Sequence, residues 1–414
     1  MSESIKKAGE ERPVWLSIVG IGEEGVKALG EAAREAIRQS AHVFGGKRHL
    51  ALAKSLIKGQ AQSWPSPFDT EFAQIVKHRG ERVCVLASGD PFFYGVGASL
   101  ARLVSPAEMQ VFPAPSAFSL AAARLGWPLQ EVILLSLHAR PMELLRPHLQ
   151  PKRKILALTN GADSPALVAD YLVQLGFGRS KMTVLEALGG DEEKISTVQA
   201  ASFDLPKVNP LNLLALEIVP SSVEARVLPC TPGLPDDWYE HDGQISKREI
   251  RALTLSALQP RAGELLWDIG AGSGSVGIEW MLAHPANRTI AIERDPARAR
   301  RITRNADALG VPLLEVVQGE APRILKSLPP PDAVFVGGGG SNAKLMSAAM
   351  AALSSGGRLV ANGVTMEMEK ALAELATEHG GHLIRLALSR CQPLGRMTSF
   401  RPALPITQWS WIKP

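Results

Sequence analysis

A glycine-rich segment beyond the middle of the chain combines residue types that bind cofactors. The mainly apolar residues 265–269 predict a buried strand, and the glycines at alternate positions of 270–274 predict a tight turn into a helix beginning near Ser275. Glycine lets a ligand approach the backbone closely, and a helix N-terminus offers free N–H groups to an anionic group. Glu293 ends the next apolar run, where a carboxylate accepts hydrogen bonds from a ribose diol. The pattern predicts a site for a cofactor that contains adenosine.

Three acidic residues mark the ends of successive predicted strands in this half. Asp268 precedes the glycine loop, Glu293 follows the second strand, and Glu320 follows the third. A dinucleotide site requires Gly-x-Gly-x-x-Gly, whereas this loop reads Gly-x-Gly-x-Gly. The loop and its acids resemble the class I S-adenosylmethionine-dependent methyltransferases, with a nicotinamide cofactor as the alternative. The resemblance implies that the loop passes the methionine portion, Glu293 holds the ribose and Glu320 borders the adenine. The cofactor-binding residues that it implies are Ser246, Asp268, Gly270, Ala271, Gly272, Ser273, Gly274, Glu293, Glu320 and Ala321.

Three loops of the front half also follow apolar runs. They span residues 19–22, 87–91 and 114–117, and the second reads Ala-Ser-Gly-Asp-Pro. In this order and spacing they resemble the class III tetrapyrrole methylases, in which two α/β lobes hold S-adenosylmethionine in the cleft between them. Asp90 could instead cap its own turn without touching a ligand. The cofactor-binding residues that the resemblance implies are Gly20, Gly22, Gly89, Asp90, Ser116 and Ala117.

A class III front half joined to a class I rear half resembles the two-domain decarboxylating methyltransferases of cobalamin biosynthesis. Residues 44–50, 136–140, 187–193 and 241–247 add local matches. The resemblance implies S-adenosyl-L-methionine as cofactor and a tetrapyrrole (precorrin) as substrate. It further implies methylation at carbon 5 by the front half, and methylation at carbon 15 with loss of the ring C acetate carboxyl by the rear half. Relatives of both halves associate, so the resemblance also implies a homo-oligomer.

The substrate of such an enzyme is flat and carries many carboxylates. Residues 337–340 are four glycines after the fourth rear strand, and we expect Gly338 and Gly339 to lie under the macrocycle, although a flexible turn is the alternative. Arg396 and Arg401, near this rim, are candidates for the carboxylates, and they could equally be surface residues. The electron-rich macrocycle is itself the nucleophile, so no catalytic residue is nominated. His138 is a candidate acid or base, but a lone histidine is more often structural.

The chain divides at a proline-rich stretch. Four prolines and two adjacent aspartates fall between residues 220 and 240, a composition typical of a linker. We predict a tetrapyrrole methylase domain of two α/β lobes at 1–220, a linker at 221–240 and a class I domain at 241–414. Strands at 289–292, 314–317, 333–336 and 357–361 alternate with helices, which predicts a Rossmann-like doubly wound sheet. Segments 382–389 and 397–402, joined without a helix, predict its antiparallel edge.

Composition restricts the remaining classes of protein. The chain has 414 residues, a formal charge of +4 and 45% hydrophobic residues, as ordinary globular proteins do. Its three cysteines are far apart and its histidines form no metal-spaced pair, so we predict neither disulfides nor a metal site. No apolar run approaches the about 18–20 residues of a membrane span, and residues 1–12 are polar. We expect a cytoplasmic protein without a membrane or nucleic-acid partner.

Three alternative functions stay open at this stage. An RNA methyltransferase of class III type is compatible with the isoelectric point of 8.9, although aromatic residues make up only 5% and form no basic, aromatic stripe. The front half could instead bind a tetrapyrrole and hand it on, leaving catalysis to the rear half. An NAD-dependent oxidoreductase is the third alternative, and it requires nicotinamide binding.

Overall fold

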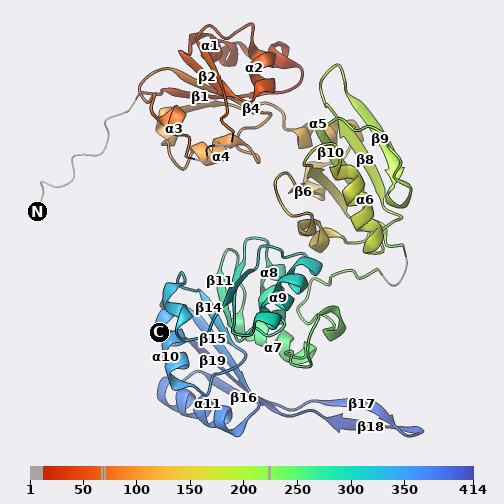
Figure 1. The fold of residues 1–414 in the computed structure, drawn as a ribbon, viewed down its shortest axis with the longest axis vertical. Helices are drawn as coiled ribbons and strands as arrows, with labels where there is room; N and C mark the ends of the chain where they lie inside the picture. The colour runs from red at the N-terminus through yellow and green to blue at the C-terminus, as the bar shows by residue number, and fades with distance from the viewer. Residues whose placement is uncertain (1–12, 67–68, 70, 222–224) are drawn as a thin grey trace, which may run out of the picture. The chain divides into compact units, whose positions relative to one another are not determined.

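The computed structural model describes residues 13–66, 69, 71–221 and 225–414, and its chain forms two compact units (Figure 1). Unit 1 comprises Met1–Arg140 and Gln150–Arg226, and unit 2 comprises Pro141–Leu149 and Val227–Pro414. A short 3-10 segment, Met142–His148, is therefore grouped with the rear part of the chain, although it lies within the front half of the sequence. The boundaries expected from the prolines, at 220 and 241, stay a prediction.

The first lobe of unit 1 is a parallel sheet with the strand order β3-β2-β4-β1-β5. Its strands are β1 (Leu16–Ile21), β2 (His42–Gly45), β3 (Gln60–Ser63), β4 (Val83–Ser88) and β5 (Met109–Phe112). Its helices are α1 (Glu31–Gln39), α2 (Lys47–Ala53), α3 (Ala73–Val76) and α4 (Val96–Leu100). Side chains of β1 alternate between two clusters, with Leu16 and Ile18 in one and Val19 and Ile21 in the other. This alternation buries both faces of the strand, as expected in the middle of a parallel sheet.

The second lobe of unit 1 is a mixed sheet with the order β6-β7-β10-β8-β9. Its strands are β6 (Val132–Ser136), β7 (Lys154–Leu158), β8 (Lys181–Glu186), β9 (Lys194–Gln199) and β10 (Asn212–Glu217), and its helices are α5 (Ala117–Leu125) and α6 (Ser164–Gln174). Only β6 and β7 run parallel, and β10 lies antiparallel between β7 and β8. Helix α5 packs Phe118 and Ala121 against this sheet, so the loop that precedes α5 connects the two lobes.

Unit 2 contains a seven-stranded sheet with the order β13-β12-β11-β14-β15-β19-β16. Its strands are β11 (Leu265–Ile269), β12 (Arg288–Glu293), β13 (Glu315–Gln318), β14 (Ala333–Val336), β15 (Arg358–Gly363), β16 (His382–Leu386) and β19 (Ile406–Ile412). The first five are parallel, and β19 runs antiparallel between β15 and β16. Two lobes followed by a Rossmann-like sheet with an antiparallel edge confirm the expected fold class. The strands predicted at 289–292, 314–317, 333–336 and 357–361 are also confirmed, as β12 to β15.

Helices cover both faces of this sheet. They are α7 (Arg248–Leu258), α8 (Ser275–Ala283), α9 (Pro296–Ala308), α10 (Ala343–Ala352) and α11 (Met366–His379). Leu266 packs in the cluster formed with α7, α8 and α9, whereas its neighbour Trp267 packs in the cluster formed with α10 and α11. The chain order reverses between β11 and β14, which creates the crevice where open α/β sheets bind ligands.

The predicted pairing of the antiparallel edge is wrong. Segment 397–402 is β18 (Met397–Pro402), and it pairs only with β17 (Ser389–Leu394), in a hairpin that projects from unit 2 (Figure 1). Gly395, at φ 61°, lets the chain reverse tightly between these two strands, so they pair with each other. The edge itself is β16 paired with β19, whose Trp409 and Trp411 are buried in the core.

A buried ion pair joins the segment before α7 to the core of unit 2. Arg251 on α7 has no exposed surface, and its Nε lies 2.5 Å from Oε1 of Glu279 on α8. The Glu279 carboxylate also accepts hydrogen bonds from the backbone N–H groups of Gly233 and Leu234, at 2.6 and 2.9 Å, and from the hydroxyl of Tyr239 at 2.9 Å. These contacts fix residues 233–239, which come from the proline-rich stretch, against two helices.

Replacing Glu279 is expected to destabilise unit 2 strongly. Glu279→Ala leaves the buried Arg251 guanidinium without its carboxylate partner, a change that costs about 3–5 kcal/mol. Glu374→Ala is the matched control, because the Lys370–Glu374 pair is exposed and should contribute less than about 1 kcal/mol. Urea unfolding followed by tryptophan fluorescence would measure both. Equal loss of stability in the two variants would contradict the assignment.

Candidate functional site

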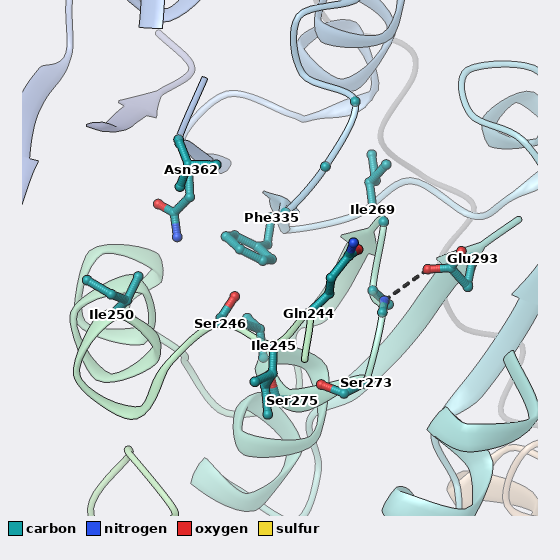
Figure 2. Close-up of a pocket in the computed structure, with 18 of the residues that line it drawn as sticks. Gln244, Ile245, Ser246, Ile250, Ile269, Ser273, Ser275, Glu293, Phe335 and Asn362 are labelled. Atoms are coloured by element: carbon teal, nitrogen blue, oxygen red, sulfur yellow. Dashed lines mark hydrogen bonds between the residues drawn. The ribbon is translucent and has the colours of Figure 1, made fainter. Parts of the chain in front are cut away.

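Unit 2 contains a cavity of about 1000 Å³ at the carboxyl ends of its parallel strands. The segments that border it include residues 243–247 before α7, residues 269–273 at the end of β11 and residues 337–339 after β14 (Figure 2). The last two segments meet where the strand order reverses, and a Cβ added at Gly270 would lie 3.1 Å from the backbone nitrogen of Gly338. The two loops therefore approach each other through bare backbone at the crevice where open α/β sheets bind ligands.

The glycine loop has the geometry that its sequence predicts. Gly270, Gly272 and Gly274 all have positive φ, at 71°, 60° and 76°, which glycine adopts without a steric penalty. Gly274 is the N-cap of α8, so the free N–H groups of this helix begin directly after the loop. The N–H groups of Gly270, Ala271 and Gly274 donate to backbone carbonyls, and that of Gly272 donates to Glu293, so the donors for an anionic group of a ligand lie at the start of α8.

Glu293 is held rigidly at the end of β12. One carboxylate oxygen accepts a hydrogen bond from Gly272 N–H at 3.0 Å, the dashed line in Figure 2, and the other accepts from Asp295 N–H at 3.0 Å. A carboxylate oxygen can accept more than one hydrogen bond, so both oxygens retain acceptor capacity. The geometry fits a diol whose two hydroxyl groups donate to one carboxylate.

Most residues predicted for the rear cofactor line this cavity. They are Ser246, Gly270, Ala271, Gly272, Ser273, Glu293, Glu320 and Ala321, together with the predicted substrate residues Gly338 and Gly339. Nothing lies within 4 Å of a Cβ added at Gly338, so the floor of the cavity is open there. These residues come from four separate loops and from the end of β12, and the sheet brings them together.

Asp268 and Gly274 are not among the lining residues. Asp268 is buried beneath the loop, and its Oδ2 accepts a hydrogen bond from Gly277 N–H of α8 at 3.0 Å. Its Oδ1 has no hydrogen-bond partner among the described residues. Burial raises the pKa of Asp268 to about 7, and the negative charge of Glu293 adds to the shift. Asp268 therefore anchors the first turn of α8 and does not face the cavity.

The structure carries Arg396 and Arg401 on the hairpin, and neither lines the cavity. Both arginines were expected near the glycine-rich rim, but β17 and β18 extend away from the sheet as a pair (Figure 1). The arginine of this hairpin that does line the cavity is Arg390, on β17.

Several lining residues were missed by the sequence analysis. Gln244 and Ile245 lie beside Ser246, and Phe335 and Asn362 lie on the opposite side from Glu293 (Figure 2). Asn362 near the end of β15 could have been found, because polar residues near the carboxyl ends of parallel strands often bind ligands. Arg390 gives no such signal, since only the hairpin brings it to the cavity.

The three predicted loops of unit 1 converge at the carboxyl ends of β1, β4 and β5. Gly89 N–H donates to the carbonyl of Ile21 at 3.3 Å, and Ala114 N–H donates to the carbonyl of Gly89 at 3.2 Å. A Cβ added at Gly20 would lie 1.8 Å from the Gly89 oxygen, so only glycine fits there. Gly89 itself has φ 54°. The close packing of these loops explains the glycines, and it presents their backbone at the edge of the sheet.

The polar residues of these loops make local contacts. Asp90 Oδ1 accepts from Phe92 N–H at 2.8 Å, the turn-capping contact considered above. Ser116 is the N-cap of α5 and accepts from Ser119 N–H at 3.1 Å, and Ala117 begins the helix. A Cβ added at Gly22 would lie 3.2 Å from the carboxylate of Glu24. None of these contacts tests a ligand role, which stays a prediction for the front residues.

A polar cluster that was not predicted lies beside these loops. His49 Nε2 lies 2.8 Å from the hydroxyl of Ser88, the last residue of β4, and Arg48 Nη2 donates to the same hydroxyl at 3.0 Å. Burial and the charge of Arg48 lower the pKa of His49 to about 4, so its ring is neutral at physiological pH.

His138, the candidate acid or base, contacts the carbonyl of Thr159 through Nδ1 at 3.3 Å.

One histidine cluster in unit 1 has ligand types suited to a metal ion. Among the residues that the structure describes, His42, His78 and Glu81 converge. Each ring lies 3.0 Å from a different oxygen of the Glu81 carboxylate, and the two rings stack with centroids 3.7 Å apart. The Glu81 carboxylate thus holds both rings, and we assign no metal to this cluster.

Among the helices in the described ranges, none combines the length and the apolar character that a membrane span requires.

Comparison with known protein families agrees with this two-part organisation. Residues 16–204 match the family described as tetrapyrrole (corrin/porphyrin) methylases, and residues 237–413 match the precorrin methyltransferase domain. The first match covers most of the two lobes in unit 1, and the second covers the sheet and the cavity of unit 2.

Similarity to individual proteins extends over most of the chain in one case and over less than half of it in two others. A precorrin-6Y C(5,15)-methyltransferase [decarboxylating] of Sinorhizobium sp is 55% identical over 399 residues, 96% of each chain. A cobalt-precorrin-6B C(15)-methyltransferase (decarboxylating) of Salmonella typhimurium is 39% identical and covers 39% of this chain and 85% of its own. The solved C-terminal domain of precorrin-6Y C5,15-methyltransferase from Rhodobacter capsulatus is 48% identical, with a TM-score of 0.43 over 45% of this chain and 100% of its own.

The raised pKa of Asp268 predicts a specific dependence of stability on pH. The pKa in the folded state, about 7, exceeds the ordinary value of 3.8, so the folded protein binds an extra proton between these values. This contribution to the free energy of unfolding is therefore complete below about pH 4 and decreases as pH rises to about 7. Asp268→Asn keeps an acceptor for Gly277 N–H and should remove the decrease. Urea unfolding across this pH range measures the free energy of unfolding of both proteins. Asp237→Asn, at an exposed position, is the control, and its dependence of stability on pH should match that of the original protein.

Proposed function

The chain belongs to the precorrin-6Y C(5,15)-methyltransferase (decarboxylating) family, and from this membership we propose how its two units divide the chemistry. The protein is a decarboxylating C-methyltransferase of cobalamin biosynthesis. We propose that unit 2 binds S-adenosyl-L-methionine in its cavity, methylates carbon 15 and promotes loss of the ring C acetate carboxyl. Unit 1 binds a second S-adenosyl-L-methionine at its converging loops and methylates carbon 5. Because the family acts on a precorrin, the RNA methyltransferase alternative is withdrawn.

The similarity to a shorter relative supports this division. The Salmonella protein is named for methylation at carbon 15 and decarboxylation alone, and it matches 39% of this chain. A protein that matches less than half of this chain is therefore named for both reactions. We assign the remaining methylation, at carbon 5, to the other unit.

The anchored carboxylate of Glu293 is the observation that carries the cofactor assignment. It lies in a cavity bordered by the glycine loop and by other loops at the carboxyl ends of the strands, with its two oxygens oriented by Gly272 and Asp295. The residues that would hold the cofactor are Glu293 at the ribose, Glu320 and Ala321 at the adenine, and the glycine loop at the methionine portion. The open space at Gly338 leaves room beside them, so the residues present fit the group.

The bound cofactor supplies a methyl group on a cationic sulfur for transfer to carbon. The chain's own contribution is to orient the reacting groups, which can supply about 7–11 kcal/mol of the barrier. Gly338 and Gly339 would let the macrocycle lie directly against the backbone. The apolar side chains of Phe335 and Ile269 exclude water from the parts of the cavity wall that they form. No nucleophilic side chain is required, because the attacking electrons belong to the macrocycle.

Calorimetric titration of the full chain with S-adenosylhomocysteine tests the cofactor assignment. We expect two sites per chain and no heat with NAD, because each unit provides its own backbone loops and acidic or polar partners. A single site would restrict methylation to one unit and favour a carrier role for the other. Binding of NAD in place of S-adenosylhomocysteine would overturn the proposal.

Gly272→Asp is expected to abolish cofactor binding in unit 2 alone. The new carboxylate would enter the cavity beside Glu293, because Gly272 N–H donates to that residue, and φ 60° would strain the backbone. Calorimetry should then give one site per chain. Gly356→Asp is the matched control. Gly356 also has a positive φ, 78°, and nothing lies within 4 Å of a Cβ added there, but it does not line the cavity. Two sites in Gly272→Asp would show that the loop is not the binding site.

A further inference from the structure

The cavity of unit 2 is large for a site that holds one ligand. Pockets for single ligands span about 300–1000 Å³, and this cavity, of about 1000 Å³, is at the upper limit. Glu293 and the glycine loop occupy one side, while Ile250, Phe335 and Asn362 lie on the other (Figure 2). The second side has no assigned ligand. It is the part of the cavity that continues towards the base of the hairpin.

Apolar side chains line this second side. Leu386, Leu388 and Leu404 come from the segments on either side of the hairpin, and Val364 follows β15. Leu404 is 76% exposed and Val364 is 54% exposed. Grouped apolar side chains that are open to solvent beside a cavity indicate a surface that binds a ligand. A flat, apolar macrocycle would cover them.

Two arginines stand side by side at the base of the hairpin. Arg390 on β17 and Arg401 on β18 are directly opposite each other in the antiparallel ladder, which places both side chains on one face. Like charges opposite each other destabilise a strand pair. One carboxylate, that of Glu249 in the first turn of α7, pairs with Arg390. Among the described residues no carboxylate pairs with Arg401, so this face has an excess of positive charge.

The Arg390–Glu249 pair is suited to exchange. Its side chains are 39% and 44% exposed, and exposed ion pairs contribute less than about 1 kcal/mol. Arg390 also lines the cavity, whereas Glu249 does not. An incoming carboxylate could therefore replace Glu249 on Arg390 at little cost and would also relieve the repulsion from Arg401.

We propose that Arg390 and Arg401 together bind side-chain carboxylates of the corrin precursor while its ring covers the apolar side of the cavity. Glu249 holds Arg390 until a substrate carboxylate displaces it. This inference rests on the proposed function of the cavity, and it makes the base of the hairpin the part of unit 2 that recognises a polycarboxylated substrate.

The test is the steady-state KM for precorrin-6Y in carbon dioxide release by the full chain at saturating S-adenosyl-L-methionine. Arg390→Gln and Arg401→Gln should each raise this KM about 10- to 100-fold, the range for loss of a hydrogen bond to a charged group. Glu249→Gln should lower the KM, because a competitor for Arg390 is removed. All three variants should bind S-adenosylhomocysteine with unchanged affinity.

Arg385→Gln is the matched control. Arg385 on β16 is an exposed arginine that pairs with Glu369, and it does not line the cavity. The KM of the Arg385→Gln variant for precorrin-6Y should therefore stay unchanged. An unchanged KM in Arg390→Gln, or a raised KM in Glu249→Gln, would overturn this inference. Failure of the original protein to bind S-adenosylhomocysteine in unit 2 would instead overturn the proposed function, so the two failures are distinguishable.

Discussion

Arg251 and Glu279 form an ion pair in the core of unit 2, and the cavity depends on it. Removing two charges from water is costly, and the cost is recovered only when hydrogen bonds satisfy both groups. Here the Glu279 carboxylate accepts from backbone and from Tyr239, and the Arg251 guanidinium donates to the carbonyls of Leu234 and Ser246. Ser246 lines the cavity. The pair therefore fixes a cavity wall that belongs to no strand of the sheet.

Both units place their loops at the carboxyl ends of parallel strands. In unit 1 the packing of Gly20 against Gly89 brings two strand ends into backbone contact, and in unit 2 Gly270 and Gly338 do the same. These close approaches favour glycine, and they leave the backbone without side chains where the loops meet. Such a surface suits a reaction in which the protein orients two ligands and supplies no nucleophile of its own.

The cavity of unit 2 has two chemically different sides. Glu293 and the glycine loop make one side polar and rigid, because both carboxylate oxygens of Glu293 accept hydrogen bonds from backbone N–H groups. The other side is apolar, and an ion pair at its rim is exposed and exchangeable. This difference follows from the fold, since the first side is built on the central strands β11 and β12 and the second on the edge of the sheet and the hairpin.

Local sequence patterns determined much of this description. The glycine spacing of 270–274, the strands before it and after it, and the acid at Glu293 could all be predicted, because strand burial and turn geometry depend on neighbouring residues. What only the tertiary structure decided depends on contacts between distant segments. Asp268 is buried beneath the loop, β18 pairs with β17 and not with β16, and Arg390 reaches the cavity while Arg396 and Arg401 do not line it. Burial of a carboxylate and the pairing of strands are set by the whole packed fold, so no local pattern encodes them.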